Sequence, residues 1–305
     1  MRKIRTSAAL AAAALAVGLS PSMASAAITV QTTTNATTMV NNLVGGGTGI
    51  TIVAGSATYT GANMASGTFT GGNFLGSQFT SGVVLTSGDA TKLDGPNGGT
   101  SDYSTNNGFA GGNTRLDAIV TPQATHNAST LTFKFIPTSD VISFQFVFGS
   151  DEYSEFVGSS FNDVFGFFLN GQNIALIPGT TTPVAINNVN NGNTSNNTPA
   201  KNSQYFTDNI NGGLDTKLDG LVGQKIALFA TASVTPGQES TIEIAIADTT
   251  DSSYDSAVFL RSGSFIDEPP PPPPTGIPLP AGVWGGMSLL SGLGLFSKIK
   301  RRRKS

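Results

Sequence analysis

The chain has 305 residues, with 37 glycines, one histidine and no cysteine. This composition excludes a disulfide framework, a thiol nucleophile and any metal site built from several histidines. Outside the two termini, seven basic residues stand against all 19 acidic ones, a net charge of −12 that excludes the basic footprint of a nucleic-acid-binding protein.

The N-terminus has the three parts of a secretory signal peptide. Three basic residues within the first five positions precede an apolar run at 8–19, and the small residues Ala24 and Ala26 follow. A basic region, an apolar region and an A-x-A site predict cleavage after Ala26. We therefore assign residues 1–26 to a signal peptide and expect an exported protein.

Strand patterns dominate residues 27–266, which we treat as one domain. Apolar side chains alternate along 131–136 and 141–148, and the turn residues between the two runs predict a hairpin. Further strands are expected at 163–171, ending in an Asn-Gly turn, and at 225–234, 240–248 and 255–263. Many short strands separated by turns predict an all-β fold, a β-sandwich or jelly roll. The pattern leaves open whether residues 27–125 join the same sandwich.

Acidic residues gather at the ends of the expected strands. The candidate metal ligands are Asp151, Glu152, Glu155, Asp163, Asp248, Asp251 and Asp255. Ca²⁺ takes six to eight oxygen ligands in flexible geometry, so carboxylates on loops that converge would suit it. The spacing is not that of an EF-hand, and the alternative is that these side chains only stabilise turns. We predict a calcium site from this pattern.

A carbohydrate-active enzyme is the alternative function. Two carboxylates could act as acid and base in glycoside hydrolysis, with Asp151 or Glu152 set against Asp248. The one tryptophan, Trp284, lies near the C-terminus and offers the domain no platform for a sugar ring. The chain also lacks a G-x-S-x-G elbow, a P-loop and an H-E-x-x-H motif. We therefore expect no catalytic residues.

A proline run ends the domain. Six prolines at 269–274 lie within a Pro-rich linker that we place at 267–276, and they are expected to form a stiff polyproline II segment.

The remaining residues, 277–305, have the pattern of a short membrane segment. The uncharged stretch 281–296 is followed by a basic cluster that includes Arg301, Arg302 and Arg303. Its 16 residues would rise only about 24 Å as a helix, less than the ~30 Å hydrocarbon core of a bilayer. With the basic end in the cytoplasm, the segment is expected to be held transiently in the inner membrane.

Two parts of the chain resemble known families. The blocks at 146–190 and 242–263, with a looser match at 82–97, resemble the bacterial choice-of-anchor L domain family. The resemblance spans roughly residues 40–265. It implies a secreted β-rich domain that is paired with a C-terminal sorting signal and has no established enzymatic activity.

The C-terminal segment is similar to the PEP-CTERM class of sorting signals, in the variant with a V-P-L-P-A motif. Here Ile277 replaces the leading valine and is followed by Pro278, Leu279, Pro280 and Ala281. The similarity implies processing by an exosortase-type enzyme in a Gram-negative bacterium.

Together these features predict a non-enzymatic protein that is exported to the cell surface, the outer membrane or the extracellular space. The expected role is adhesive or structural within a biofilm or extracellular polysaccharide matrix, with Ca²⁺ as a stabilising ion. Expected partners are a polysaccharide or another surface protein, and no nucleic acid. A passive surface structural protein is a further alternative.

Overall fold

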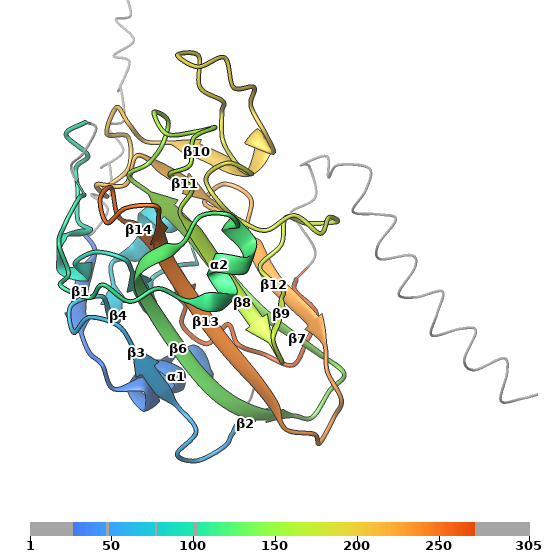
Figure 1. The fold of residues 1–305 in the computed structure, drawn as a ribbon. Helices are drawn as coiled ribbons and strands as arrows, with labels where there is room; N and C mark the ends of the chain where they lie inside the picture. Colours follow the sequence, from blue (N-terminus) through green and yellow to red (C-terminus); the bar gives the residue numbers. More distant parts are fainter. Residues whose placement is uncertain (1–26, 47–48, 77, 100–102, 272–305) are drawn as a thin grey trace, which may run out of the picture.

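The computed structural model describes residues 27–46, 49–76, 78–99 and 103–271. Two antiparallel β-sheets lie face to face in this part of the chain (Figure 1). The α-helices of the described residues are two short ones, α1 (Ala36–Leu43) and α2 (Thr114–Val120). The predicted all-β sandwich is therefore confirmed.

The predicted signal peptide (1–26) and C-terminal sorting segment (277–305) lie outside the described residues. Among the residues that are described, no helix is both long enough and apolar enough to cross a bilayer.

The first sheet has the strand order β1-β4-β5-β14-β7-β11-β10, and β12 pairs with the part of β7 that β11 leaves free. Its strands are β1 (Thr29–Thr32), β4 (Ser66–Thr70), β5 (Ser81–Thr86), β7 (Val141–Ser150), β10 (Phe206–Asp208), β11 (Gly220–Val222), β12 (Leu228–Ser233) and β14 (Ser256–Arg261).

The second sheet has the order β2-β6-β13-β8-β9, and β3 also pairs with β6. Its strands are β2 (Ile50–Ile52), β3 (Thr58–Thr60), β6 (Thr125–Pro137), β8 (Val164–Leu169), β9 (Gln172–Asn173) and β13 (Ser240–Thr249). Short 3₁₀ turns occur at η1 (Gly72–Leu75), η2 (Ala90–Lys92) and η3 (Ser203–Tyr205).

Residues 27–125 belong to the same sandwich, a point that the sequence pattern left open. Strands β1, β4 and β5 extend the first sheet, and β2 and β3 pair with β6 in the second.

The predicted hairpin at 131–136 and 141–148 is wrong. Both segments are strands, but β6 lies in the second sheet and β7 in the first, so the connection crosses the sandwich. Strand β6 pairs with β13 on one edge and with β2 and β3 on the other, while β7 pairs with β14, β11 and β12. Alternation fixes which side chains face the core but does not fix which strand lies alongside.

The Asn-Gly turn after β8 is confirmed. Asn170 and Gly171 have φ angles of 49° and 88°, and they join β8 to β9. Both residues of a tight two-residue hairpin turn need positive φ, which asparagine tolerates and glycine adopts freely.

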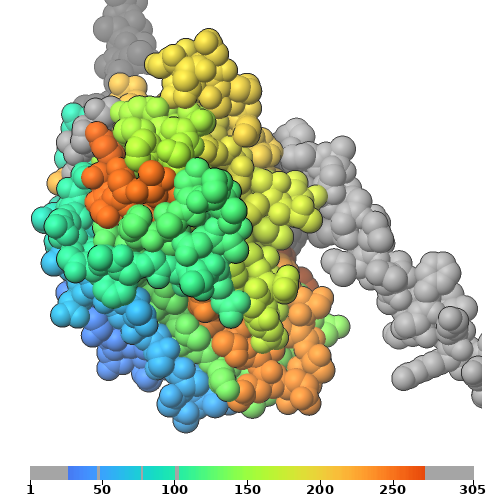
Figure 2. Space-filling model, in the orientation of Figure 1, coloured from blue at the N-terminus to red at the C-terminus, as the bar shows by residue number. Residues whose placement is uncertain are grey.

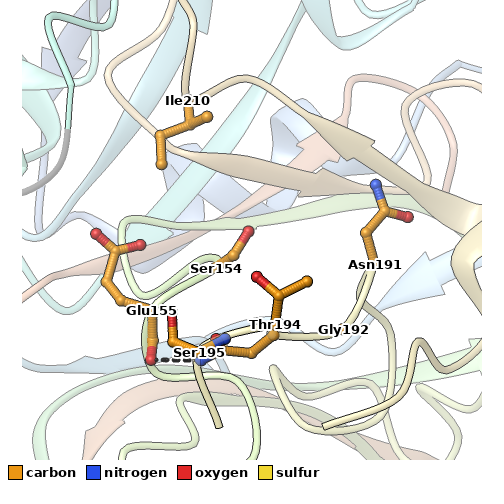
Figure 3. A pocket seen from close by; sticks show the side chains of 8 residues that line it. Ser154, Glu155, Asn191, Gly192, Thr194, Ser195 and Ile210 are labelled. Atoms are coloured by element: carbon orange, nitrogen blue, oxygen red, sulfur yellow. Dashed lines mark hydrogen bonds between the residues drawn. The ribbon is translucent and has the colours of Figure 1, made fainter. Parts of the chain in front are cut away.

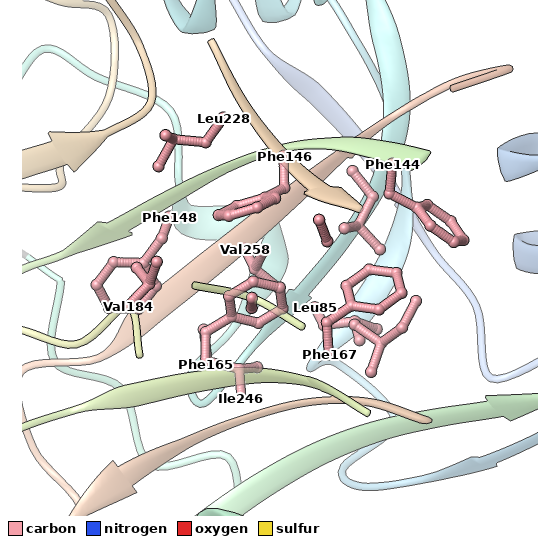
Figure 4. Packing of buried hydrophobic residues seen from close by; sticks show 14 of the residues in the cluster. Leu85, Phe144, Phe146, Phe148, Phe165, Phe167, Val184, Leu228, Ile246 and Val258 are labelled. Atoms are coloured by element: carbon pink, nitrogen blue, oxygen red, sulfur yellow. The ribbon is translucent and has the colours of Figure 1, made fainter. Parts of the chain in front are cut away.

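Aromatic side chains from both sheets fill the central core (Figure 4). Phe144 of β7 stacks on Phe265 with ring centroids 3.9 Å apart and also contacts Phe167 of β8 at 4.4 Å. Phe146 meets Phe165 at 5.1 Å. These buried rings hold the two sheets together, because each removes a large apolar surface from water.

The outer faces of both sheets are also partly covered. In β14, Val258 and Leu260 face the central core, whereas Phe259 packs in a second cluster with Phe69 and Phe74. The outer face of the second sheet is covered by α2. Burial on both faces explains why β8 is apolar or glycine at every position, whereas β7 also buries the polar residues Ser143, Gln145 and Ser150.

Candidate cation site

The strand registers bring acidic residues from both sheets to the same end of the sandwich. In the first sheet Ser256 pairs with Ser150, so Asp151 and Asp255 are neighbours. In the second sheet Ala247 pairs with Val164, which places Asp248 beside Asp163. The chain between β13 and β14 crosses from the second sheet to the first at this end, and it therefore joins the two pairs.

Five of the seven predicted carboxylates are buried together; we call them the strand-end cluster. They are Asp151, Glu152, Asp163, Asp248 and Asp255, each at most 1% exposed. Of the other two, Asp251 is half-buried and Glu155 is exposed. The charges of Asp251 and Asp248 contribute to the raised pKa of Glu152, so the segments that follow β7 and β13 lie near one another.

Hydrogen bonds satisfy only part of the strand-end cluster. Asp163 accepts from the Thr249 backbone N–H at 2.9 Å and from Ser256 Oγ at 2.6 Å. Asp255 Oδ2 accepts from both the N–H and the hydroxyl of Thr105, at 2.6 and 2.7 Å.

Several buried oxygen atoms of the strand-end cluster have no hydrogen-bond partner in the described structure. They are Glu152 Oε2, Asp248 Oδ1 and Asp255 Oδ1. The buried hydroxyl oxygen of Thr249 also has no hydrogen-bond partner. Buried polar atoms without partners are rare, and an ionised carboxylate in that position costs several kcal/mol.

The protonation equilibria of the strand-end cluster are shifted accordingly. Burial, together with the charges of Asp251, Asp248 and Asp151, raises the pKa of Glu152 to about 9. Burial also raises the pKa of Asp255 to about 7, despite its bonds to Thr105. The pKa values of Asp163 and Asp248 lie well above the usual range for the same reason, reinforced by neighbouring carboxylates.

The ion pairs of the described residues lie away from four of the cluster carboxylates. Lys92–Asp89, Arg115–Glu243 and Lys134–Glu239 are ion pairs of the described residues, and none of them includes Glu152, Asp163, Asp248 or Asp255. Lys92 is the basic residue whose charge reaches Asp255, and its own side chain is 57% exposed. Protons or a bound cation would reduce the repulsion among these carboxylates.

Sequence reasoning missed the loop that closes one side of the strand-end cluster. The Tyr103 N–H donates to Asp151 at 3.1 Å, and Thr105 holds Asp255 as described above. A Cβ at Gly88 would collide with the Asp255 carboxylate, so only glycine lets the backbone pass here. Asn127 on β6 donates to Asp248 at 3.1 Å. No motif or periodic pattern in the sequence indicated these contacts.

The segments around the cluster lie side by side on one face (Figure 2). Thr250 Oγ1 donates to the Ser160 carbonyl, and the Thr250 N–H donates to the Ala124 carbonyl. The Tyr254 N–H donates to the Ser104 hydroxyl. The three loops thus form one connected surface above the buried carboxylates.

The donor set fits a hard cation such as Ca²⁺, although the side chains do not yet converge on one point. No group of three or more Asp, Glu or His residues in the described part of the chain has metal-binding geometry as it stands. Glu152, Asp248 and Asp255 each nevertheless have one buried carboxylate oxygen without a hydrogen-bond partner in the described structure. All are oxygen donors, which Ca²⁺ prefers, and thiolates are absent from the sequence.

Comparison with known proteins identifies the family of the domain. The model of the Choice-of-anchor L domain matches residues 28–266. No curated protein and no solved structure matches the chain. Because the match covers most of the chain, this protein belongs to the Choice-of-anchor L domain family, whose members are exported or surface-associated proteins.

Proposed function

We propose that this protein is an adhesive or matrix component of the bacterial surface, and that Ca²⁺ bound by the strand-end cluster stabilises it. Membership of the family supports the surface location. The observation that carries the calcium proposal is the set of buried carboxylate oxygens without partners on Glu152, Asp248 and Asp255.

Calcium would link the two sheets. Asp151 follows β7 and Asp255 precedes β14 in the first sheet, whereas Asp163 precedes β8 and Asp248 lies near the end of β13 in the second. An ion held by residues from both pairs would replace repulsion between carboxylates by attraction to a shared charge. It would thereby order the three loops that form this end of the surface.

The alternative of a carbohydrate-active enzyme is less well supported. Its candidate residues Asp151, Glu152 and Asp248 are at most 1% exposed, so a polysaccharide chain does not reach them in this conformation. The family is also not a known enzyme family.

The route to the surface is part of the proposal. The sequence pattern of residues 1–26 supports export, and that of residues 277–305 supports transient retention in the inner membrane and processing by an exosortase-type enzyme. The host would then be a Gram-negative bacterium, and the partner of the mature protein a polysaccharide or another surface protein.

Thermal unfolding with and without calcium tests the stabilising role. At a free Ca²⁺ concentration 100-fold above its dissociation constant, binding to the folded state adds about 2.7 kcal/mol. For a domain of this size, that raises the Tm by roughly 5–10 °C above the value in EGTA. Asp163→Asn combined with Asp248→Asn should abolish the shift, whereas the exposed pair Asp140→Asn and Asp208→Asn should retain it. An equal Tm in Ca²⁺ and EGTA would contradict the proposal.

A further inference from the structure

A groove of about 410 Å³ opens beside the strand-end cluster (Figure 3). One wall comes from Ser154 and Glu155, which directly follow the cluster residues 151 and 152. The other walls come from the Asn-rich loop 191–195 and from Ile210. The volume lies within the range of about 300–1,000 Å³ typical of small-ligand sites.

The base of the groove is fixed by asparagine side chains. Asn193 is 7% exposed; its Nδ2 donates to the Glu155 carbonyl at 2.8 Å and its Oδ1 accepts from the Ser195 N–H at 2.9 Å. Asn196 donates to the Val157 carbonyl at 2.9 Å. These bonds tie the Asn-rich loop to the segment that follows β7, so the groove is held in shape without a ligand.

The polar side chains on the rim of the groove, in contrast, remain available for hydrogen bonds with a ligand. The hydroxyls of Ser154, Thr194 and Ser195, the amide of Asn191 and the carboxylate of Glu155 make no side-chain hydrogen bond or ion pair within the described structure. Figure 3 shows the polar ends of Glu155, Ser154, Thr194 and Asn191 arranged around the opening, with Ile210 on the opposite side.

We propose that this groove binds a neutral glycan. Hydroxyl and amide groups both donate and accept hydrogen bonds, as sugar hydroxyls do. No Lys, Arg or His lines the groove, and the body of the chain has a net charge of −12, so a polyanion would be repelled. Ile210 supplies an apolar contact for the C–H face of a sugar ring.

The groove also depends on the strand-end cluster through the chain. Ser154 and Glu155 follow Glu152 by two and three residues. Tyr153, which lies between Glu152 and Ser154, anchors this segment because its hydroxyl donates to the Val189 carbonyl at 2.8 Å. A cation that orders Glu152 would therefore order one wall of the groove. The glycan site deepens the proposed function, which names a polysaccharide as a partner, and the coupling rests on the calcium ion of that proposal.

Affinity electrophoresis of the purified protein tests the inference. Native gels contain a neutral polymer (dextran, galactomannan or soluble starch) or the anionic polymer alginate, each with Ca²⁺ or EGTA. We expect at least one neutral polymer to retard the protein and alginate to leave its mobility unchanged. Combining Asn191→Ala with Thr194→Ala should weaken binding about tenfold, the equivalent of roughly one lost hydrogen bond. The exposed pair Thr231→Ala and Gln238→Ala is the matched control.

The outcomes separate the two proposals. If no neutral polymer retards the protein, or if the groove variant binds as well as wild type, the glycan site is refuted even when calcium raises the Tm. If retardation depends on the groove residues but is the same in EGTA, the glycan site stands and its coupling to calcium fails.

Discussion

Replacing Glu152 by glutamine should change how the stability of the metal-free protein depends on pH. Burial and the surrounding carboxylates Asp151, Asp248, Asp251 and Glu155 raise the pKa of Glu152 from an ordinary value of 4.5 to about 9. Between these two values the folded protein keeps a proton that the unfolded chain has released. The free energy of unfolding therefore falls as pH rises, by about 1.4 kcal/mol per pH unit for this group.

The size of the effect follows directly. From pH 6 to pH 8 the Glu152 contribution falls by roughly 3 kcal/mol in the wild type and is absent in Glu152→Gln. Wild type and variant should therefore diverge with rising pH, and the variant should be the more stable at pH 8.

Urea unfolding at pH 6, 7 and 8, in buffer treated with a chelator, measures this divergence. Glu239→Gln is the matched control, because the Glu239 side chain is 47% exposed and pairs with Lys134 at 2.8 Å on the surface. The free energy of unfolding of that variant should change with pH as it does in the wild type. If the free energy of unfolding of Glu152→Gln also changes with pH as in the wild type, Glu152 is already ionised in the folded protein. The argument for a strained carboxylate cluster is then refuted. Added Ca²⁺ should flatten the wild-type curve, because the ion displaces the protons.

Three further changes test the fold and the export route. Phe144→Ala removes a ring that stacks on Phe265 in the core and should cost roughly 3–5 kcal/mol in urea unfolding. Burial would raise the pKa of Asp267, but hydrogen bonds from Thr138 and Ser139 outweigh it and hold the pKa below its usual value. Asp267→Asn should therefore cost roughly 2 kcal/mol at pH 7, and the difference from wild type should shrink as pH falls through the lowered pKa. Replacing Arg301, Arg302 and Arg303 by glutamine should leave the C-terminal segment unprocessed, seen as a larger species on immunoblots of cell fractions.

The fold class followed from the sequence because alternation is a local signal. In β13, Ile242, Ile244 and Ile246 alternate with smaller or polar residues, and the strand lies where the pattern placed it. The Asn-Gly turn after β8 was equally clear. Partner choice is not local, so the connection from β6 to β7 was misread as a hairpin although both strands were recognised.

The candidate site could be predicted only in part, for a related reason. Five of the carboxylates are buried at one end of the sandwich, since strand ends meet wherever the strands are neighbours, but their side chains do not have metal-binding geometry. The loop that brings Tyr103 and Thr105 onto the cluster carries no periodic pattern, and its contacts join residues 48 and 150 positions apart. The sequence also could not predict that Glu152 is buried and Glu155 is exposed, because both residues lie in one short acidic segment.

The position of the strand-end cluster gives it more influence on the fold than its size suggests. The connection from β13 to β14 begins two residues after Asp248, which lies within β13, and ends at Asp255, and here the chain passes from the second sheet to the first. Repulsion among these carboxylates acts against the closure of the sandwich at this end, while a proton or a cation relieves it. The buried phenylalanine rings of the core carry no titratable group, whereas we expect this end of the sandwich to respond to pH and, under the proposed function, to the cations present.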